Sequence, residues 1–255
     1  MSRNRKIRAI VGTKGGVGKS VLAFDVLPTI VKNPVVFEID SNNNTSLSNS
    51  KIKSQNFNVK KIDLAVDKMD LNLMSANDED LIIDVGAGQD TREFLKAIRD
   101  EDFELEFYLP MNDDFEQFDN IQDTIKLIKE SSPKSIINLV LNRCHSAEKE
   151  EVKVQFLNIF GNEDYGIEER YSLISKDIEN IYFLPDTPIF GIIKRQYQKH
   201  FIDAVGWAND LIDNKAKYKK AWVEEGDDVF IKNKKILRLA SKVLELNDRL
   251  LKSFK

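Results

Sequence analysis

Cysteine and histidine are almost absent from this sequence. Its 255 residues include one cysteine, Cys144, and two histidines, His145 and His200. One chain therefore cannot build a disulfide framework, a four-ligand zinc site or a cysteine-bridged iron–sulfur cluster. The chemistry of the protein has to come from other residue types.

Long apolar runs are also missing. No run approaches the roughly 18 residues that a membrane-spanning helix needs. The basic residues 1–6 lead into a β-like segment and a glycine loop rather than a long apolar stretch, so we expect no secretion signal and a cytoplasmic protein. Hydrophobic residues make up 42% of the chain and charged residues 31%, a composition typical of a globular protein with one sizeable core.

Charge is unevenly distributed along the chain. Residues 1–193 contain 23 Lys and Arg against 33 Asp and Glu, whereas residues 194–255 contain 15 against 9. The net charge therefore changes from −10 to +6. A basic tail of this kind indicates contact with phosphate backbones or anionic lipid, or a solvated helical face.

Short apolar segments alternate with segments of helical potential along most of the chain. The alternation predicts an α/β fold, in which helices cover both faces of a mostly parallel, twisted sheet. Residues 41–61 have no clear period and are interpreted as a loop that contains one further strand near 57–59. The other predicted strands are residues 7–11, 35–39, 81–85, 104–109, 136–141 and 181–184, and the predicted helices lie near 20–31, 91–100, 114–130, 148–160 and 188–214.

The last segment has a different pattern. From Ile236 onward apolar residues recur at helical spacing with lysines and arginines between them, which predicts a basic amphipathic helix over residues 232–255. Packing against the body of the protein, contact with DNA and anchoring to a membrane remain open for this helix. We therefore expect a domain over residues 1–215 and a helical extension over 216–255.

A glycine-rich loop follows the first predicted strand and precedes the first predicted helix. It ends in Gly18-Lys19-Ser20, the end of a nucleoside-triphosphate loop, but its first glycine, Gly12, lies one residue too early for the common pattern. Glycines let successive N–H groups converge on a phosphate at the positive end of a helix. Lys19 is suited to neutralise the β- and γ-phosphates, and the Ser20 hydroxyl is suited to ligate Mg²⁺.

The sequence Lys14-Gly15-Gly16-Val17-Gly18-Lys19-Ser20 resembles the deviant Walker A loop of the ParA/MinD family of P-loop ATPases. The resemblance implies a dimer that holds ATP between its two subunits. It implies that Lys14 reaches the ATP of the partner subunit while Lys19 binds phosphate within its own chain. The loop residues expected to bind the nucleotide are Gly15, Gly16, Val17, Gly18, Lys19, Ser20 and Val21.

Three later segments extend the resemblance to about residue 190. Asp40 follows the second strand, where the family has a switch aspartate that helps to arrange the attacking water and lies near the metal. Asp84 ends a later apolar strand, where the family has the Walker B acid that holds Mg²⁺ through water. The segments that resemble the base-binding turns are Asn142-Arg143 and Pro185-Asp186. Ser41, Asn42, Val85 and Ala87 depart from the family pattern beside these acids.

The resemblance implies an ATPase that binds ATP and Mg²⁺ and dimerises with ATP. In its relatives, hydrolysis is slow, is stimulated by an activating partner, and releases the dimer from non-specific DNA, a membrane or an adaptor. The sequence thus predicts partition or positioning of a plasmid or other cargo, with catalytic roles for Lys14, Lys19 and Asp40 and a metal site at Ser20, Asp40 and Asp84. Alternatives are a membrane-associated positioning ATPase, a conjugative-transfer or plasmid-stability ATPase, a P-loop kinase or synthetase, and a nucleotide-bound adaptor without hydrolysis.

Overall fold

The computed structural model describes residues 7–41, 50–74, 78–101 and 103–254. The chain divides into two compact units, the first made of residues 1–46 and 52–187 and the second of residues 47–51 and 188–255. The predicted boundary at residue 215 lies inside the second unit. Part of the predicted loop over residues 41–61 falls on positions 42–49, which are outside the described residues.

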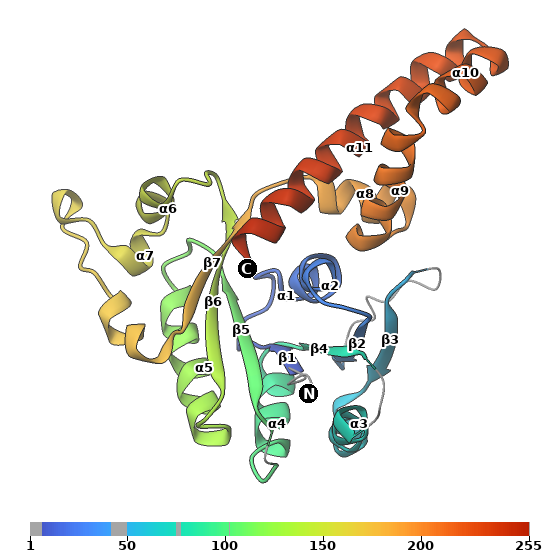
Figure 1. Ribbon diagram of the computed structural model, residues 1–255. Coiled ribbons are helices and arrows are strands. Elements are labelled where there is room, and N and C mark those ends of the chain that lie inside the picture. The colour runs from blue at the N-terminus through green and yellow to red at the C-terminus, as the bar shows by residue number, and fades with distance from the viewer. Residues whose placement is uncertain (1–6, 42–49, 75–77, 102, 255) are drawn as a thin grey trace. The chain divides into compact units, whose positions relative to one another are not determined.

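The first unit contains a seven-stranded sheet whose strands all run parallel. The strand order is β3-β2-β4-β1-β5-β6-β7, so β3 and β7 form the two edges (Figure 1). The predicted α/β fold with a parallel sheet is confirmed. The strands are β1 Ile7–Ile10, β2 Pro34–Ile39, β3 Lys53–Phe57, β4 Asp80–Val85, β5 Leu105–Met111, β6 Ile136–Cys144 and β7 Asn180–Pro185. The strand expected near 57–59 thus lies slightly earlier, at β3.

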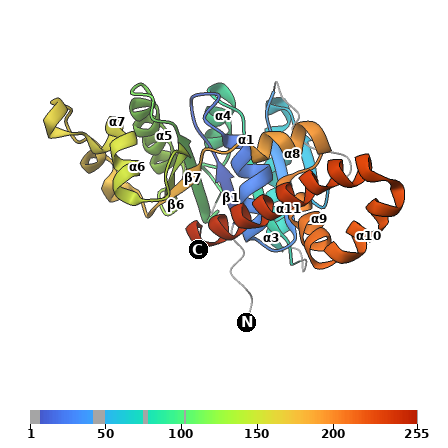
Figure 2. The same ribbon diagram turned by 90° about the horizontal axis from the view of Figure 1, so that it is seen from above.

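Helices lie on both faces of this sheet. One face carries the segment that includes α1 and α2, and the other carries α3, α4 and α5 (Figures 1 and 2). The helices of the first unit are α1 Lys19–Val21, α2 Leu27–Ile30, α3 Ile62–Met74, α4 Gln89–Ala97, α5 Gln117–Ser131, α6 Lys149–Gln155 and α7 Leu157–Phe160. Four short 3₁₀ turns lie at Val59–Lys61, Glu163–Tyr165, Tyr171–Leu173 and Ser175–Asp177. Helix α3 has no counterpart among the predicted helices.

A π-helical turn, Leu22–Val26, joins α1 to α2. The reason is Pro28, which lacks a backbone N–H and whose ring would clash with the carbonyl of residue 24 in a regular helix. The wider turn removes that conflict, because the N–H of Leu27 donates to the carbonyl of Leu22, five residues back. The helix after the phosphate loop therefore continues to Ile30, close to its predicted end.

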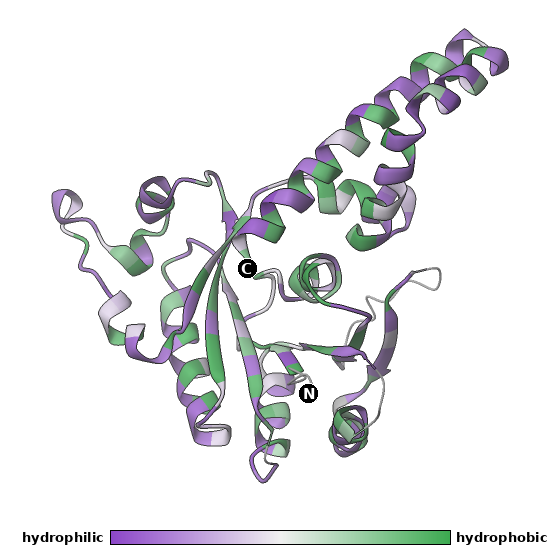
Figure 3. Cartoon of the chain, viewed as in Figure 1, coloured by the Kyte–Doolittle hydropathy of each residue, from purple (hydrophilic) through white to green (hydrophobic). Residues whose placement is uncertain are grey.

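The strands read as apolar runs because both of their faces are covered. In Figure 3 the central strands are largely hydrophobic, and the buried apolar residues of α4 and α5 belong to the same core as those of the strands. The main core includes Phe37 of β2, Phe94 of α4, Phe107 of β5 and Phe118 of α5, none of them more than 3% exposed. This packing holds the carboxyl ends of the strands in place, the edge at which open parallel sheets bind ligands.

The second unit consists of four helices: α8 Ile189–Tyr197, α9 Phe201–Asp213, α10 Lys215–Glu225 and α11 Asp227–Ser253. The helix predicted over 188–214 is thus divided into α8 and α9, and the predicted basic helix is the last part of α11. Helix α11 packs along α9 and α10 and buries one apolar stripe, formed by Leu237, Ala240, Val243, Leu246 and Leu250. None of the described helices is both long and apolar enough to cross a membrane.

An early segment of the chain also belongs to the second unit. Asp203 of α9 accepts hydrogen bonds from the Ser50 hydroxyl at 2.7 Å and from the Lys51 backbone N–H at 2.9 Å. Asp203 is 8% exposed, so its two carboxylate oxygens need these donors. The bonds attach the segment before β3 to the first turn of α9.

Candidate nucleotide-binding site

The glycine-rich loop lies at the carboxyl end of β1 and leads directly into α1. Gly16 and Gly18 have φ angles of +76° and +98°, which side chains other than glycine rarely adopt. Gly18 has a second requirement, since a Cβ there would lie 2.4 Å from Nδ2 of Asn142. The loop is thus shaped by glycine where the backbone has to turn and where β6 approaches it.

One pocket brings together most of the residues that the sequence singled out. It has a volume of about 360 Å³ and combines the loop with the ends of β2, β4 and β6. Its lining residues are Gly15, Gly16, Gly18, Lys19, Ser20, Val21, Asp40, Asp84, Val85, Ala87 and Arg143. Glycines, one lysine and two carboxylates around one cavity are suited to a phosphate and its cation.

Lys19 and Asp84 are the buried charged groups of this pocket, with exposures of 8% and 3%. Burial lowers the pKa of Lys19, while the nearby Asp84, Asp40 and Asp90 act in the opposite direction. Burial raises the pKa of Asp84 to about 7; a hydrogen bond with Ser20 opposes the rise, and Glu38 adds to it. A bound cation would stabilise the charged form of such a buried carboxylate, because its charge compensates for the hydration that burial removes.

Glu38 is closer to the site than the sequence indicated. No motif in the sequence singles it out, yet it is 1% exposed and pairs in register with Asp84 across β2 and β4. Its carboxylate accepts a hydrogen bond from Asn56 of β3 at 3.1 Å. Two acids side by side on neighbouring strands explain part of the raised pKa of Asp84.

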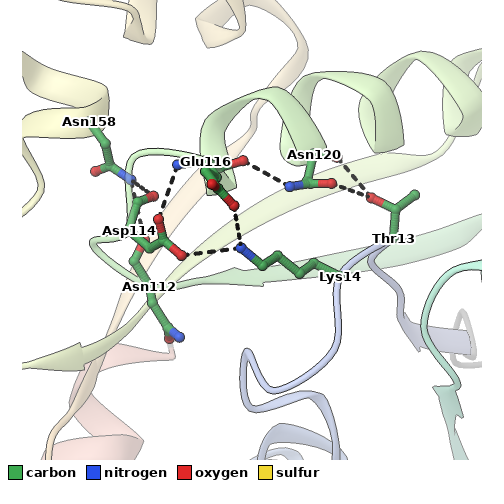
Figure 4. Close-up of polar contacts among 7 residues, drawn as sticks. All are labelled: Thr13, Lys14, Asn112, Asp114, Glu116, Asn120 and Asn158. Atoms are coloured by element: carbon green, nitrogen blue, oxygen red, sulfur yellow. Dashed lines mark hydrogen bonds and ion pairs between the residues drawn. The ribbon is translucent and has the colours of Figure 1, made fainter.

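The amine of Lys19 donates to the backbone carbonyl of Lys14 at 3.2 Å, across the loop. Lys14 itself points away from the pocket and toward the segment after β5 (Figure 4). Its Nζ donates to Asp114 at 3.1 Å and to Glu116 at 3.3 Å, and these bonds raise its pKa. The first lysine is thus bound to two acids of its own chain, while the second lies in the pocket.

The segment after β5 is itself held in place by a polar network. Asn158 of α7 donates to the backbone carbonyls of Asn112 and Asp114, at 3.3 and 2.8 Å. Thr13 approaches Asn120 of α5, with its hydroxyl 3.3 Å from the side-chain oxygen (Figure 4). These contacts hold the segment that carries Asp114 and Glu116, the two acids bound to Lys14. No motif in the sequence indicated these contacts.

The two segments expected to bind the base lie in different surroundings. Asn142 donates through Nδ2 to the carbonyl of Val17 at 2.7 Å, so in this structure its side chain braces the phosphate loop. Arg143 has a φ of +61° and lines the pocket. Pro185 and Asp186 lie at the end of β7, where the backbone N–H of Asp186 donates to the carbonyl of Cys144, and they are not among the described lining residues. The base-binding roles of these four residues stay predictions.

The start of α4 contributes two further residues. Asp90 accepts hydrogen bonds from the backbone N–H and the hydroxyl of Ser41, at 2.9 and 3.0 Å. The Thr91 hydroxyl lies 3.1 Å from the carbonyl of Gly12 and 2.7 Å from that of Gly86. This helix start therefore links the phosphate loop to the segments after β2 and β4. An Asp-Thr pair after a glycine turn was the only sequence signal for it.

The oxygen ligands of the pocket suit a magnesium ion better than a metal whose ligands all come from protein side chains. Among the described residues no group of three or more His, Cys, Asp and Glu side chains could hold a metal. Mg²⁺ usually takes one or two carboxylates together with water and phosphate oxygens. Ser20, Asp40 and Asp84 in one pocket match that habit.

No protein-family model matches the chain, and no curated protein matches it in sequence. Solved structures do match it in fold. Apo McdA from Cyanothece aligns with a TM-score of 0.50 and 11% identity, over 76% of this chain and 90% of McdA. A complex of an aspartate-to-alanine variant of Cyanothece McdA with ATP aligns with a TM-score of 0.50 and 10% identity, over 76% and 88% of the two chains. A putative plasmid partition protein from Borrelia burgdorferi, bound to AMPPNP, aligns with a TM-score of 0.43 and 12% identity, over 72% and 88%.

At this level of identity the likeness concerns the fold. The chain has the P-loop, ParA-like fold that it shares with McdA.

Proposed function

We propose that this chain is an ATPase that dimerises with ATP and positions or partitions a cargo. The observation that carries the proposal is the single pocket in which Lys19, Ser20, Asp40 and Asp84 meet beneath the glycine-rich loop. The ParA-like fold, shared with a protein that has been crystallised with ATP, supports it.

Each residue of the pocket has a chemical task in this proposal. The loop N–H groups and Lys19 bind the β- and γ-phosphates, and Ser20 with Asp40 and Asp84 would hold Mg²⁺. The bound ion would screen the charge that develops on the transferred phosphoryl group. Asp40, which lines the pocket from the end of β2, orients the attacking water.

Lys14 is the residue that would make the site a shared one. Its side chain is 34% exposed and is bound to two exposed acids, with Asp114 at 50% and Glu116 at 82%. Ion pairs at such positions exchange with water easily. Lys14 can therefore leave these acids for the phosphates of a partner subunit at little cost, because a phosphate offers it more charge than either carboxylate.

Analytical ultracentrifugation with and without ATP and Mg²⁺ tests the shared site. The wild-type chain is expected to sediment as a dimer only with ATP. Lys19→Ala is expected to lose nucleotide binding itself, whereas Asp40→Ala is expected to keep an ATP-bound dimer and lose hydrolysis. A monomer under every condition, with ATP bound and hydrolysed normally, would favour a kinase or synthetase instead.

Helix α11 favours DNA over a membrane as the surface that the dimer binds. Its apolar stripe is buried within the chain, so an anchor would have to unpack it before it could enter lipid. Its cations are exposed, and five of them follow one line along the helix at alternating spacings of three and four residues, interrupted by Glu245: Lys235, Arg238, Lys242, Arg249 and Lys252. A straight row of cations suits the phosphate backbone of a duplex, without recognition of its sequence.

DNA binding is tested by titration of non-specific duplex at several salt concentrations, with and without ATP. The expected result is an affinity that needs ATP and falls steeply with salt. Lys235→Glu with Lys242→Glu is expected to abolish it, while Lys217→Glu with Lys220→Glu on α10 serves as the matched control of equal charge. Sedimentation with anionic vesicles, rather than with DNA, would support the membrane alternative.

In the cell the proposal places the protein in the cytoplasm, associated with the nucleoid while ATP is bound. An adaptor would connect the dimer to its cargo, and an activating partner would set the time of hydrolysis. Loss of the γ-phosphate would remove the group that both subunits hold, so the dimer and its DNA-binding surface would disappear together.

A further inference from the structure

The two edge strands of the sheet differ in how they are protected. Strand β3 is polar, is largely exposed, and begins with Lys53, a residue that discourages pairing with another strand. Strand β7, Asn180–Pro185, contains no charged residue, and its Ile181, Tyr182 and Phe183 are only partly buried. Its other side pairs with β6, and among the described residues no strand pairs with its outer side. An apolar edge of this kind is open to strand addition.

The space beside β7 is hollowed rather than filled. A pocket of about 630 Å³ lies against the strand, and a second of about 650 Å³ adjoins it, because Phe160 and Glu169 line both. Together they form a groove, which we call the β7 groove. Its apolar floor consists of Phe160, Ile167, Tyr171, Ile181 and Phe183.

The rim of the β7 groove is mainly acidic. Glu163, Glu168 and Glu179 line it and are exposed. Two lysines, Lys149 and Lys153, also line it, and Lys153 is bound to Glu150 at 2.9 Å. Residues 145–179, which connect β6 to β7 and surround the groove, contain 9 Asp and Glu against 4 Lys and Arg. The groove therefore combines an apolar floor with a negative field.

We propose that the β7 groove binds an extended, positively charged segment of a partner protein, which adds a strand to the edge of the sheet. The segment's backbone pairs with the outer side of β7. Apolar side chains of the segment pack on the aromatic floor and its Lys or Arg side chains reach the acidic rim, so the expected segment mixes apolar residues with Lys or Arg. This site is separate from the nucleotide pocket and does not depend on the proposed ATPase activity.

A second copy of this chain is a poorer occupant of the groove. Two copies related by a twofold axis would pair their β7 strands antiparallel and face the same surface to itself. Each acidic rim would then lie against another acidic rim, and like charges at close range oppose association. A cationic partner removes that conflict.

The test uses nucleotide-free protein and three kinds of synthetic peptide. The first peptide is Lys-Val-Lys-Val-Lys-Val-Lys-Val, the second replaces each lysine by glutamate, and the third is the first with N-methyl groups on alternate backbone nitrogens, made in both registers. Fluorescence anisotropy measures the affinity of each. The basic peptide is expected to bind at least about tenfold more tightly than the acidic peptide and than at least one N-methylated register, since strand addition needs its N–H groups.

Two triple variants locate the binding surface. Charge reversal of the rim, Glu163→Lys with Glu168→Lys and Glu179→Lys, is expected to weaken the basic peptide at least about tenfold. The matched control places the same three charges on the exposed face of α3, with Asp63→Lys, Asp67→Lys and Asp70→Lys, and is expected to stay within about twofold. Circular dichroism establishes that both variants are folded.

Amide hydrogen exchange distinguishes strand addition from attraction by charge alone, because charge attraction does not pair the backbone of β7. Bound basic peptide is expected to slow exchange along β7 and leave β3 unchanged. Equal weakening by the two triple variants, binding of both N-methylated registers as tight as that of the unmethylated basic peptide, or unchanged exchange along β7 would each overturn the proposal. Binding that appears only as dimerisation of the chain would assign the edge to a second copy and would overturn it as well.

Discussion

At the residue scale, the candidate nucleotide pocket buries a carboxyl group whose charged form is disfavoured there. Asp84 is buried beside Glu38, and the raised pKa follows from that position. The same arrangement that makes Asp84 costly in the empty protein prepares it for a cation, because the carboxylate has few other partners to give up. Asp84 thus lowers the stability of the chain when the pocket is empty, and the same burial favours binding of a cation.

The pH dependence of stability follows from this carboxyl group. Its pKa is about 7 in the folded chain, whereas an unfolded aspartate titrates near 3.9. The folded state therefore holds a proton that the unfolded state has lost, and the free energy of unfolding falls as pH rises from about 4 through 7. Asp84→Asn should flatten this slope by up to about 1.4 kcal/mol per pH unit. Urea denaturation of nucleotide-free protein at several pH values measures this slope. An unchanged slope in Asp84→Asn would show that burial does not raise the pKa of Asp84. Asp67→Asn, at an exposed position on α3, is the control.

Gly18 combines two constraints, so its substitution should be more severe than that of its neighbour. Gly18→Ala puts a side chain at a φ of +98° and 2.4 Å from Asn142, whereas Gly16→Ala meets only the strained φ of +76° with open space around it. Backbone strain alone costs about 1–3 kcal/mol. Gly18→Ala is expected to lose both stability and nucleotide affinity, and Gly16→Ala to lose less of each. Thermal melting and titration with a fluorescent ATP analogue compare the two variants. Equal losses of stability and affinity would show that the Asn142 side chain moves aside at no cost.

At the element scale, helix α11 has two faces with separate tasks. One face is buried along α9 and α10, and the other carries the row of cations. A helix of 27 residues with so many charges gains most of its stability from the packed face rather than from its own propensity. The basic face is then free to vary without loss of the fold.

Truncation of the packed face of α11 should therefore destabilise the chain more than loss of a neighbouring charge. Leu246 is 4% exposed, and Leu246→Ala is expected to cost about 2–5 kcal/mol through lost burial and a cavity. Glu245→Ala, at an exposed position one residue earlier, is expected to stay within about 0.5 kcal/mol. Chemical denaturation measures both values. Similar values for the two variants would mean that α11 is held loosely.

At the scale of the whole molecule, the proposed function requires features of two different units to act together. The nucleotide pocket belongs to the first unit and α11 to the second. A dimer would link them without any change inside one chain, because two copies of the cationic row double the number of phosphates that one particle contacts.

Lys14→Ala tests this linkage. The variant is expected to bind ATP as the wild type does and to stay monomeric in analytical ultracentrifugation. It should also lose the ATP-dependent gain in DNA affinity, with a logarithmic salt dependence about half as steep, since the slope follows the number of phosphates contacted. Lys149→Ala, a change of the same charge at a distant exposed position, is the control. If Lys14→Ala still dimerised with ATP, or if it bound DNA as tightly as the wild type while monomeric, the proposed link between dimerisation and DNA binding would be wrong.

The sequence by itself determined the fold class and the place of the glycine-rich loop between the first strand and the first helix. Both depend on signals that are local, because apolar runs mark buried strands and the order of strand, glycines, Lys19 and helix needs no distant partner. Helix α3 was also present as a local pattern, in the spacing of Ile62, Ala65, Val66 and Met69, but it was not assigned. The π-helical turn before Pro28 belongs to the same class of local effects.

Only the tertiary structure decided which distant residues complete the site. Asn142 braces Val17 from 125 positions away, and Lys14 binds Asp114 from 100 positions away. Such contacts leave no period in the sequence, because the sheet order places β1 between β4 and β5, which follow it much later in the chain. The same order leaves β7 at an edge, so its apolar residues, which resemble those of a buried strand, border an open groove.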